Sequence, residues 1–192
     1  MSLLHLASDP AIARMREAFV RYGNHHPVHG ALAAEFSTLL DDPLNPFLRT
    51  RLAGHFTGSA WLVSADGARV LLTHHRKLDR WLQLGGHADG EVDLAVVALN
   101  EAFEESGLSD LVIDDPEIFD LDRHWIPERG DVPGHWHYDA RYVIRATGSE
   151  AFVVSEESLA LAWRDIAGIA MDPASDESLR RMADRWQARS KV

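Results

Sequence analysis

Cysteine is absent from the 192 residues of this chain, which excludes disulfides, thiol catalysis and thiolate metal sites. Long apolar runs are also missing, because no stretch reaches the 18 or so apolar residues that cross a bilayer. The N-terminal sequence MSLLHLASDPAIARMREAF has no basic start followed by a long apolar core. We therefore expect no signal peptide and a cytoplasmic protein.

Basic residues are few: 19 Lys and Arg stand against 30 Asp and Glu, for a net charge of −11. This charge argues against a surface made for a nucleic acid polymer or an anionic membrane. It does not exclude a phosphate substrate, because a bound metal can invert the local field. A chain of 192 residues is long enough for one domain with a full core and an extension. The composition, 46% hydrophobic and 26% charged, is typical of a globular protein.

The first 50 residues carry helix signals. Ser8-Asp9-Pro10 is a typical helix start, and apolar residues then recur at helical spacing up to Val20. A second helix is predicted from about Gly30 to Leu40. We expect residues 1–50 to form a helical extension packed on the core and residues 51–192 to form the main domain.

Strand-length apolar runs begin after this region, at residues 60–63 and 70–73, with the hairpin signal Ala65-Asp66-Gly67 between them. Basic residues including Arg76 follow the second run. They could meet phosphate oxygens or form a polar turn. Further on, residues 151–154 and 159–163 are expected to be strands, and residues 164–170 and the segment after Ser175 are expected to be helices.

Residues 117–126 and 135–142 alternate between polar and apolar side chains. In a strand this alternation places His137, Asp139 and Arg141 on one face. That face is either a solvated sheet surface or a substrate or metal cleft. The loop between the two runs, residues 127–134, is polar and is a candidate for setting specificity.

The stretch from Trp81 to Leu108 organises the rest of the chain. It begins as a strand, is expected to break at Gly85-Gly86, and continues as a helix whose C′ residue is Gly107. The side of this helix predicted to face the core is the apolar set Val92, Ala95, Val96, Leu99, Ala102 and Phe103.

Three carboxylates share the other side of the helix, because Glu101, Glu104 and Glu105 stand at positions i, i+3 and i+4. Like charges this close repel each other, and a hard cation such as Mg²⁺ would neutralise them. The alternative is a solvated acidic helix end.

Together with the upstream glycines, this arrangement resembles the Nudix box, G-x5-E-x7-R-E-U-x-E-E-x-G-U with U apolar. The motif runs without a gap from Gly86 to Leu108. Two positions depart from it: Val92 stands in place of the first glutamate and Asn100 in place of the arginine. Glu91 lies one residue before the first of these. The positions that fit are Gly86, Glu101, Ala102, Glu104, Glu105, Gly107 and Leu108.

The resemblance implies an α/β fold, a Nudix-like α/β/α sandwich with a mixed, curved sheet. It also implies hydrolysis of the pyrophosphate bond in a nucleoside diphosphate linked to another moiety, with Mg²⁺ or Mn²⁺. Glu104 and Glu105 would bind the metal together with the Gly85 carbonyl. Glu101 would be a metal ligand or the general base, so Glu101 and Glu104 are the candidate catalytic residues.

The resemblance also favours a cleft at His137 and Asp139, and with Arg76 and His87 these are the candidate substrate-binding residues. Two glutamates outside the box, Glu156 and Glu157, are further candidates for metal binding or base catalysis. The substrate itself stays open, as does a homodimer.

Two other functions remain open. Val92 and Asn100 suggest a Nudix-fold module that binds or senses a nucleotide without efficient catalysis. Alternatively, the helical N-terminus could be a docking surface in a protein with an interaction role.

Overall fold

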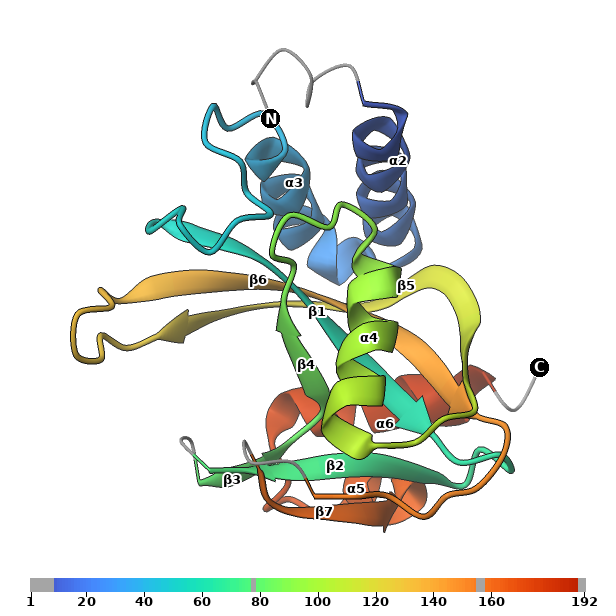
Figure 1. Ribbon diagram of the computed structural model, residues 1–192. Coiled ribbons are helices and arrows are strands. Elements are labelled where there is room, and N and C mark those ends of the chain that lie inside the picture. The colour runs from blue at the N-terminus through green and yellow to red at the C-terminus, as the bar shows by residue number, and fades with distance from the viewer. Residues whose placement is uncertain (1–8, 77–78, 155–157, 190–192) are drawn as a thin grey trace. The chain divides into compact units, whose positions relative to one another are not determined.

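The computed structural model describes residues 9–76, 79–154 and 158–189, and its ribbon is drawn in Figure 1. The helical elements are α2 (Pro10–His25), η1 (Pro27–His29), α3 (Gly30–Leu39), α4 (Leu94–Ser106), α5 (Ile166–Met171) and α6 (Glu177–Arg189). The strands are β1 (Gly54–Val63), β2 (Arg69–His75), β3 (Arg80–Leu82), β4 (Leu84–His87), β5 (Leu111–Ile126), β6 (His135–Ala146) and β7 (Ser158–Asp165).

The strands form one sheet in the order β3-β2-β1-β6-β5, with β4 paired to β1 and β7 paired to β2. Strand β2 is antiparallel to β1, β3 and β7. The predicted α/β class, with a sheet, flanking helices and an N-terminal helical part, is confirmed. In the part of the chain that the structure describes, no helix is long and apolar enough to cross a membrane.

Contacts between Cα atoms divide the chain into two compact units that interleave in sequence. The first unit contains Met1–Gly58, Gly86–Val97 and Glu117–Arg141, and the second contains Ser59–Gly85, Ala98–Pro116 and Tyr142–Val192. The domain boundary expected at residue 50 stays a prediction.

The core of the first unit is a cluster of aromatic rings. Phe19 of α2 packs on Phe36 of α3 and on Phe56 of β1, with ring centroids 5.3 and 5.8 Å apart. All three side chains are fully buried. The predicted helix start is confirmed at α2, where the Asp9 side chain accepts a hydrogen bond from the Ala11 amide at 2.8 Å.

The second unit contains β2 and β7, which pair and run beside each other in Figure 1. Helix α5 contacts both β7 and α6 in this unit. The predicted hairpin is confirmed: the Ser64 amide donates to the Arg69 carbonyl at 2.9 Å, and Gly67 has a φ of 71°. The Trp186 indole of α6 donates to the Gly67 carbonyl at 2.8 Å, which fastens the last helix to this turn.

Two expectations about strands are wrong. Residues 151–154 form no strand; instead, the Val153 amide donates to the Ser106 carbonyl at the end of α4. The expected break at Gly85 is also absent, because β4 continues from Leu84 to His87. A Cβ at Gly85 would lie only 2.8 Å from the Ser59 Cα. Glycine at this position therefore allows β4 to lie close to β1.

Candidate functional site

Helix α4 carries the three glutamates and ends as predicted, with Gly107 at a φ of 67°. Its most deeply buried side chains include Leu94, Val97 and Ala98. At helical spacing this stripe continues into Glu101 and Glu105, so the carboxylates occupy the C-terminal end of the buried face. The predicted core side is right at Ala95 and Ala102, which are buried, but its other members are only half-buried. A helix that is apolar nearly all round does not reveal its inner face by periodicity.

Glu105 is held against the glycine strand. Its Oε1 accepts a hydrogen bond from the Gly85 amide at 2.9 Å, which joins two of the residues that the Nudix resemblance pairs. Glu101 is half-buried and Glu104 is exposed. Among the residues that the structure describes, the three glutamates do not form a group whose oxygens all lie within metal-ligand spacing of one another.

The positions that depart from the Nudix box lie at the start and on the outside of α4. Asn100 is exposed and Val92 is half-buried. Glu91, the neighbour of Val92, is exposed and accepts a hydrogen bond from the Asp93 amide at 2.9 Å. Asp93 in turn accepts from the Ala95 amide at 3.1 Å. These acidic side chains therefore stabilise the turn that begins the helix.

Strands β5 and β6 carry a buried charge network in the first unit. The guanidinium of Arg141, 3% exposed, pairs with Asp139 at 2.8 Å, Asp120 at 3.1 Å and Asp122 at 3.2 Å. Asp139 also accepts from the Thr57 hydroxyl of β1 at 2.9 Å. The alternating polar face is therefore buried at its centre, and it is not a solvated sheet surface.

Burial alone would lower the pKa of Arg141, but the charges of Asp139, Asp122 and Asp120 outweigh it and raise that pKa. The side chain therefore stays charged and holds the carboxylates in place. Both oxygens of Asp139 are engaged by Thr57 and Arg141. The substrate-binding role expected for Asp139 stays a prediction.

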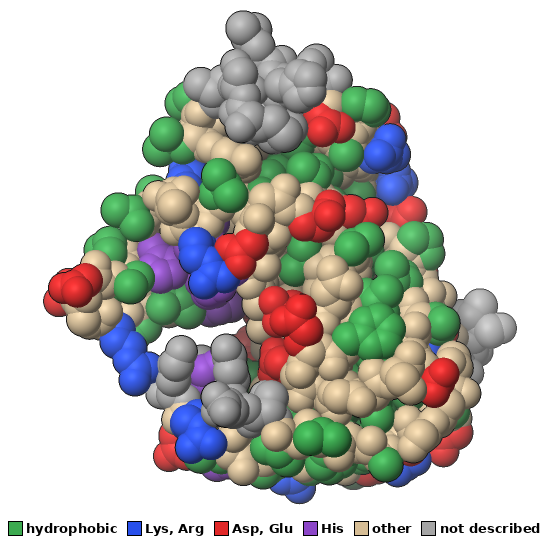
Figure 2. All heavy atoms as spheres, in the orientation of Figure 1, with side chains coloured by type: hydrophobic (Ala, Val, Ile, Leu, Met, Phe, Trp, Pro, Cys, Tyr) green, Lys and Arg blue, Asp and Glu red, His purple; other side chains and the backbone are tan. Residues whose placement is uncertain are grey.

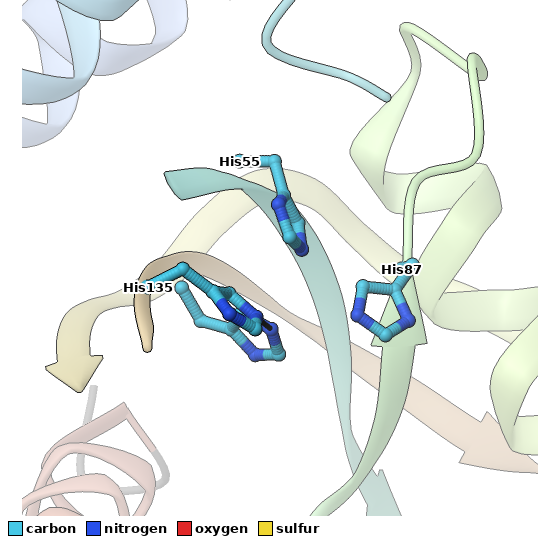
Figure 3. Close-up of side chains that lie close together, drawn as sticks. His55, His87 and His135 are labelled. Atoms are coloured by element: carbon cyan, nitrogen blue, oxygen red, sulfur yellow. Dashed lines mark hydrogen bonds between the residues drawn. The ribbon is translucent and has the colours of Figure 1, made fainter. Parts of the chain in front are cut away.

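Four imidazoles converge in the same unit. His55 comes from β1, His87 from β4, and His135 and His137 from β6; one ligand atom from each lies within 4.8 Å of the others. Figure 3 shows the rings of His55, His87 and His135 turned toward one another from these strands. His55 and His135 are buried, while His87 and His137 are half-buried.

Main-chain carbonyls orient two of these rings. His55 Nδ1 lies 3.3 Å from the Arg51 carbonyl oxygen, and His135 Nδ1 lies 2.8 Å from the Pro133 carbonyl oxygen. A carbonyl only accepts, so each Nδ1 carries the proton and each Nε2 keeps a lone pair when the ring is neutral. The Nε2 atoms of His135 and His137 lie 3.2 Å apart.

Three of the four imidazoles have a lowered pKa. Burial, more than any neighbouring charge, lowers the pKa of His87 to about 4 and that of His137 to about 2. Burial also lowers the pKa of His55. Neutral imidazole is the form that binds metal.

The charges around the histidines are paired. Arg49 forms a bidentate ion pair with Asp89, two residues after His87 in the chain. Burial lowers the pKa of His87 most, and the charge of Arg49 lowers it further. Figure 2 shows histidine side chains on one face of the molecule beside adjacent basic and acidic side chains.

The remaining candidates lie elsewhere. Arg76, at the end of β2, is exposed and donates a hydrogen bond to the Ser158 carbonyl at 3.1 Å. Glu156 and Glu157 lie outside the described residues. The sequence places His135 and His137 on one face of a strand, because they are two residues apart in an H-x-H pattern. No local pattern points to His55, which joins the cluster through the pairing of β1 with its neighbouring strands.

No protein-family model matches the chain, and no curated protein sequence matches it. Solved structures do. An Ap4A hydrolase from C. elegans aligns with a TM-score of 0.55 at 15% identity, over 71% of this chain and 97% of its own. A NUDIX-family hydrolase from Clostridium perfringens aligns at 0.51 and 28% identity, over 70% and 97%. A MutT protein from Methanosarcina mazei Go1 aligns at 0.53 and 16%, over 74% and 99%.

The fold is that of the Nudix hydrolases. The near-complete coverage of the neighbouring chains means that this chain contains the whole of their fold. The predicted Nudix-like fold class is therefore confirmed. The degenerate box and the catalytic residues expected from it stay predictions.

Proposed function

We propose that this chain is a metal-dependent hydrolase that cleaves the pyrophosphate bond of a nucleoside diphosphate linked to another moiety. The observation that carries the proposal is the hydrogen bond from the Gly85 amide to Glu105. It joins the glycine strand to the acidic end of α4 within a Nudix fold. The Ap4A hydrolase among the neighbouring structures is consistent with this substrate class.

The candidate metal ligands form an all-oxygen donor set: the carboxylates of Glu104 and Glu105 and the carbonyl of Gly85. Such donors fit Mg²⁺ or Mn²⁺. The Glu105 contact keeps that carboxylate beside the Gly85 backbone. When bound, the ion would neutralise the pyrophosphate oxygens and lower the pKa of an attacking water. The ion would also offset the mutual repulsion of the three carboxylates.

Glu101 is the candidate general base or a further metal ligand. It is half-buried on the same face of α4 as Glu105, and a base needs reach to the attacking water. Arg76 presents an exposed guanidinium that suits a phosphate oxygen. We do not propose substrate contacts for His87, His137 and Asp139, because the two imidazoles belong to the histidine cluster and both oxygens of Asp139 are engaged by Thr57 and Arg141.

The test is a phosphate-release assay, coupled to a phosphatase, over a panel of nucleoside diphosphate derivatives with Mg²⁺, Mn²⁺ or EDTA. We expect turnover that EDTA abolishes. Glu104→Gln and Glu105→Gln should each lower it by at least about 100-fold, since loss of a supporting residue alone costs 10- to 100-fold. Glu17→Gln is the control, because Glu17 is a 72% exposed side chain of α2.

Unchanged turnover in both glutamine variants would contradict the proposal. Tight nucleotide binding without metal and without turnover would instead favour the sensing module that Val92 and Asn100 suggested. A homodimer stays open, and the cytoplasmic location is a prediction from the sequence alone.

A further inference from the structure

We propose that His55, His87, His135 and His137 form a binding site for one divalent transition-metal ion, best suited to Zn²⁺. The site lies within the first unit and joins β1, β4 and β6. It is separate in its ligands and its chemistry from the carboxylates of α4. Its role is to hold these three strands together.

The spacing of the ligand atoms fits a tetrahedral ion. With Zn–N bonds of about 2.0–2.1 Å, two nitrogens of a tetrahedral site lie roughly 3.4 Å apart. The Nε2 atoms of His135 and His137 lie 3.2 Å apart, and all four ligand atoms lie within 4.8 Å of one another. Small rotations of the His55 and His87 rings, which point into the same space (Figure 3), would complete the tetrahedron.

The rings are oriented as metal ligands are. A metal-bound histidine typically donates its other ring N–H to a carbonyl, which fixes the tautomer. The carbonyls of Arg51 and Pro133 accept from His55 and His135 in this way. In their neutral form, both rings therefore present an unprotonated Nε2 to the cluster.

One of these nitrogens, His55 Nε2, makes no hydrogen bond. His55 is only 2% exposed, and its Nε2 is buried without a hydrogen-bond partner. An unsatisfied polar atom in a protein interior is destabilising, because it loses its hydrogen bonds to water. A metal bond to Nε2 would remove that cost, so the orphaned nitrogen points to a ligand at this position.

The four imidazole nitrogens determine which metal ions the site would bind. Imidazole nitrogen suits zinc and other late first-row metals, whereas Mg²⁺ requires oxygen donors. Four protein ligands fill a tetrahedral shell and leave no open position, which is the pattern of structural zinc sites. The residues come from β1, β4 and the start of β6, so a bound ion would fasten the ends of strands that are far apart in sequence.

The experiment uses the full, untagged chain after chelation and dialysis. Zn²⁺ is titrated by calorimetry, and Co²⁺ is added separately to record the visible absorption of a tetrahedral site. We expect one ion per chain, an intense Co²⁺ spectrum, no displacement by excess Mg²⁺ and a higher Tm with Zn²⁺. His87→Gln and His137→Gln should each weaken Zn²⁺ binding by about 100-fold or more.

The matched control is His25→Gln, which removes an exposed histidine at the end of α2 and should bind Zn²⁺ as the parent chain does. The two glutamine variants replace half-buried rings, and circular dichroism establishes that they are folded. Absence of stoichiometric Zn²⁺ binding by the parent chain would overturn the proposal. So would equal binding by folded His87→Gln and His137→Gln variants.

Discussion

At the scale of single residues, backbone carbonyls and ion pairs determine the state of titratable groups in the first unit. The Arg51 carbonyl orients His55, while the Arg51 side chain donates to Asp42 at 2.6 Å. That hydrogen bond lowers the pKa of Asp42 below its ordinary 3.8, against a smaller opposing effect of burial. A single residue thus positions a candidate metal ligand and anchors the segment before β1.

The Asp42 pair predicts a pH-dependent loss of stability in Asp42→Asn. Because the folded-state pKa is lowered, the carboxylate stabilises the fold above pH 3.8 and loses this effect as pH falls through the folded-state value. We expect a loss on the order of 1 kcal/mol at pH 7, shrinking toward zero below pH 3.8. Urea unfolding across this range measures it.

Asp131→Asn, at an exposed position in the loop between β5 and β6, is the control and should change the free energy of unfolding little at any pH. A loss in Asp42→Asn that is the same at pH 7 and at the acid end would contradict the ion-pair explanation.

At the scale of elements, buried polar groups join strands and helices that are far apart in sequence. The Tyr22 hydroxyl of α2 accepts from the Leu121 amide and donates to Asp120. Asp120 then pairs with Arg141 of β6. One continuous set of hydrogen bonds therefore links the N-terminal helix to β5 and β6.

Replacement of Arg141 by Met should destabilise the protein by about 3–5 kcal/mol, because it leaves buried carboxylates without a counter-charge. Arg123→Met is the control: Arg123 pairs with Glu35 but is 35% exposed, and such pairs contribute about 0–1 kcal/mol. Urea unfolding of both variants gives the comparison. Similar losses in the two would show that burial of the Arg141 network does not matter.

The packing of α4 on β1 depends on the absence of a Cβ atom at Gly58. A Cβ at Gly58 would lie 2.8 Å from both the Leu94 carbonyl oxygen and the Val97 Cβ. Gly58→Ala should therefore cost about 1–3 kcal/mol through overpacking. Gly30→Ala, with open space around it and a helical φ of −57°, should be neutral or stabilising. Thermal unfolding of both variants tests this, and equal Tm values would contradict it.

At the scale of the whole molecule, the N-terminal helices are part of a core and do not stand apart from it. Phe19 and Phe36 are fully buried against Phe56 of β1. The first unit combines these helices with segments from the middle of the chain. These helices therefore share a core with β1, the strand that carries His55.

This packing predicts that Phe19→Ala destabilises the protein by about 3–5 kcal/mol, the usual cost of truncating a buried aromatic ring. Val20→Ala is the matched control, because the neighbouring Val20 side chain is 51% exposed. Urea unfolding followed by circular dichroism compares them. If Phe19→Ala unfolds at the same urea concentration as the parent chain, the N-terminal helices are not part of the core.

The sequence by itself determined the local features. Turn and cap residues such as Asp9, Gly67 and Gly107 act within a few positions, so their helix and hairpin ends could be predicted from spacing alone. The order of glycine and glutamate residues from Gly86 to Leu108 also identified the fold, because that pattern is contained in one continuous stretch.

Only the tertiary structure decided what depends on partners distant in sequence. The inner face of α4 was ambiguous because the helix is apolar on most sides, and contact with β1 at Gly58 settles it. The polar face of β5 and β6 is buried because Arg141 finds its carboxylates on another strand. His55 joins the other histidines through strand pairing alone, since no local pattern in the chain encodes the distance between β1 and β6.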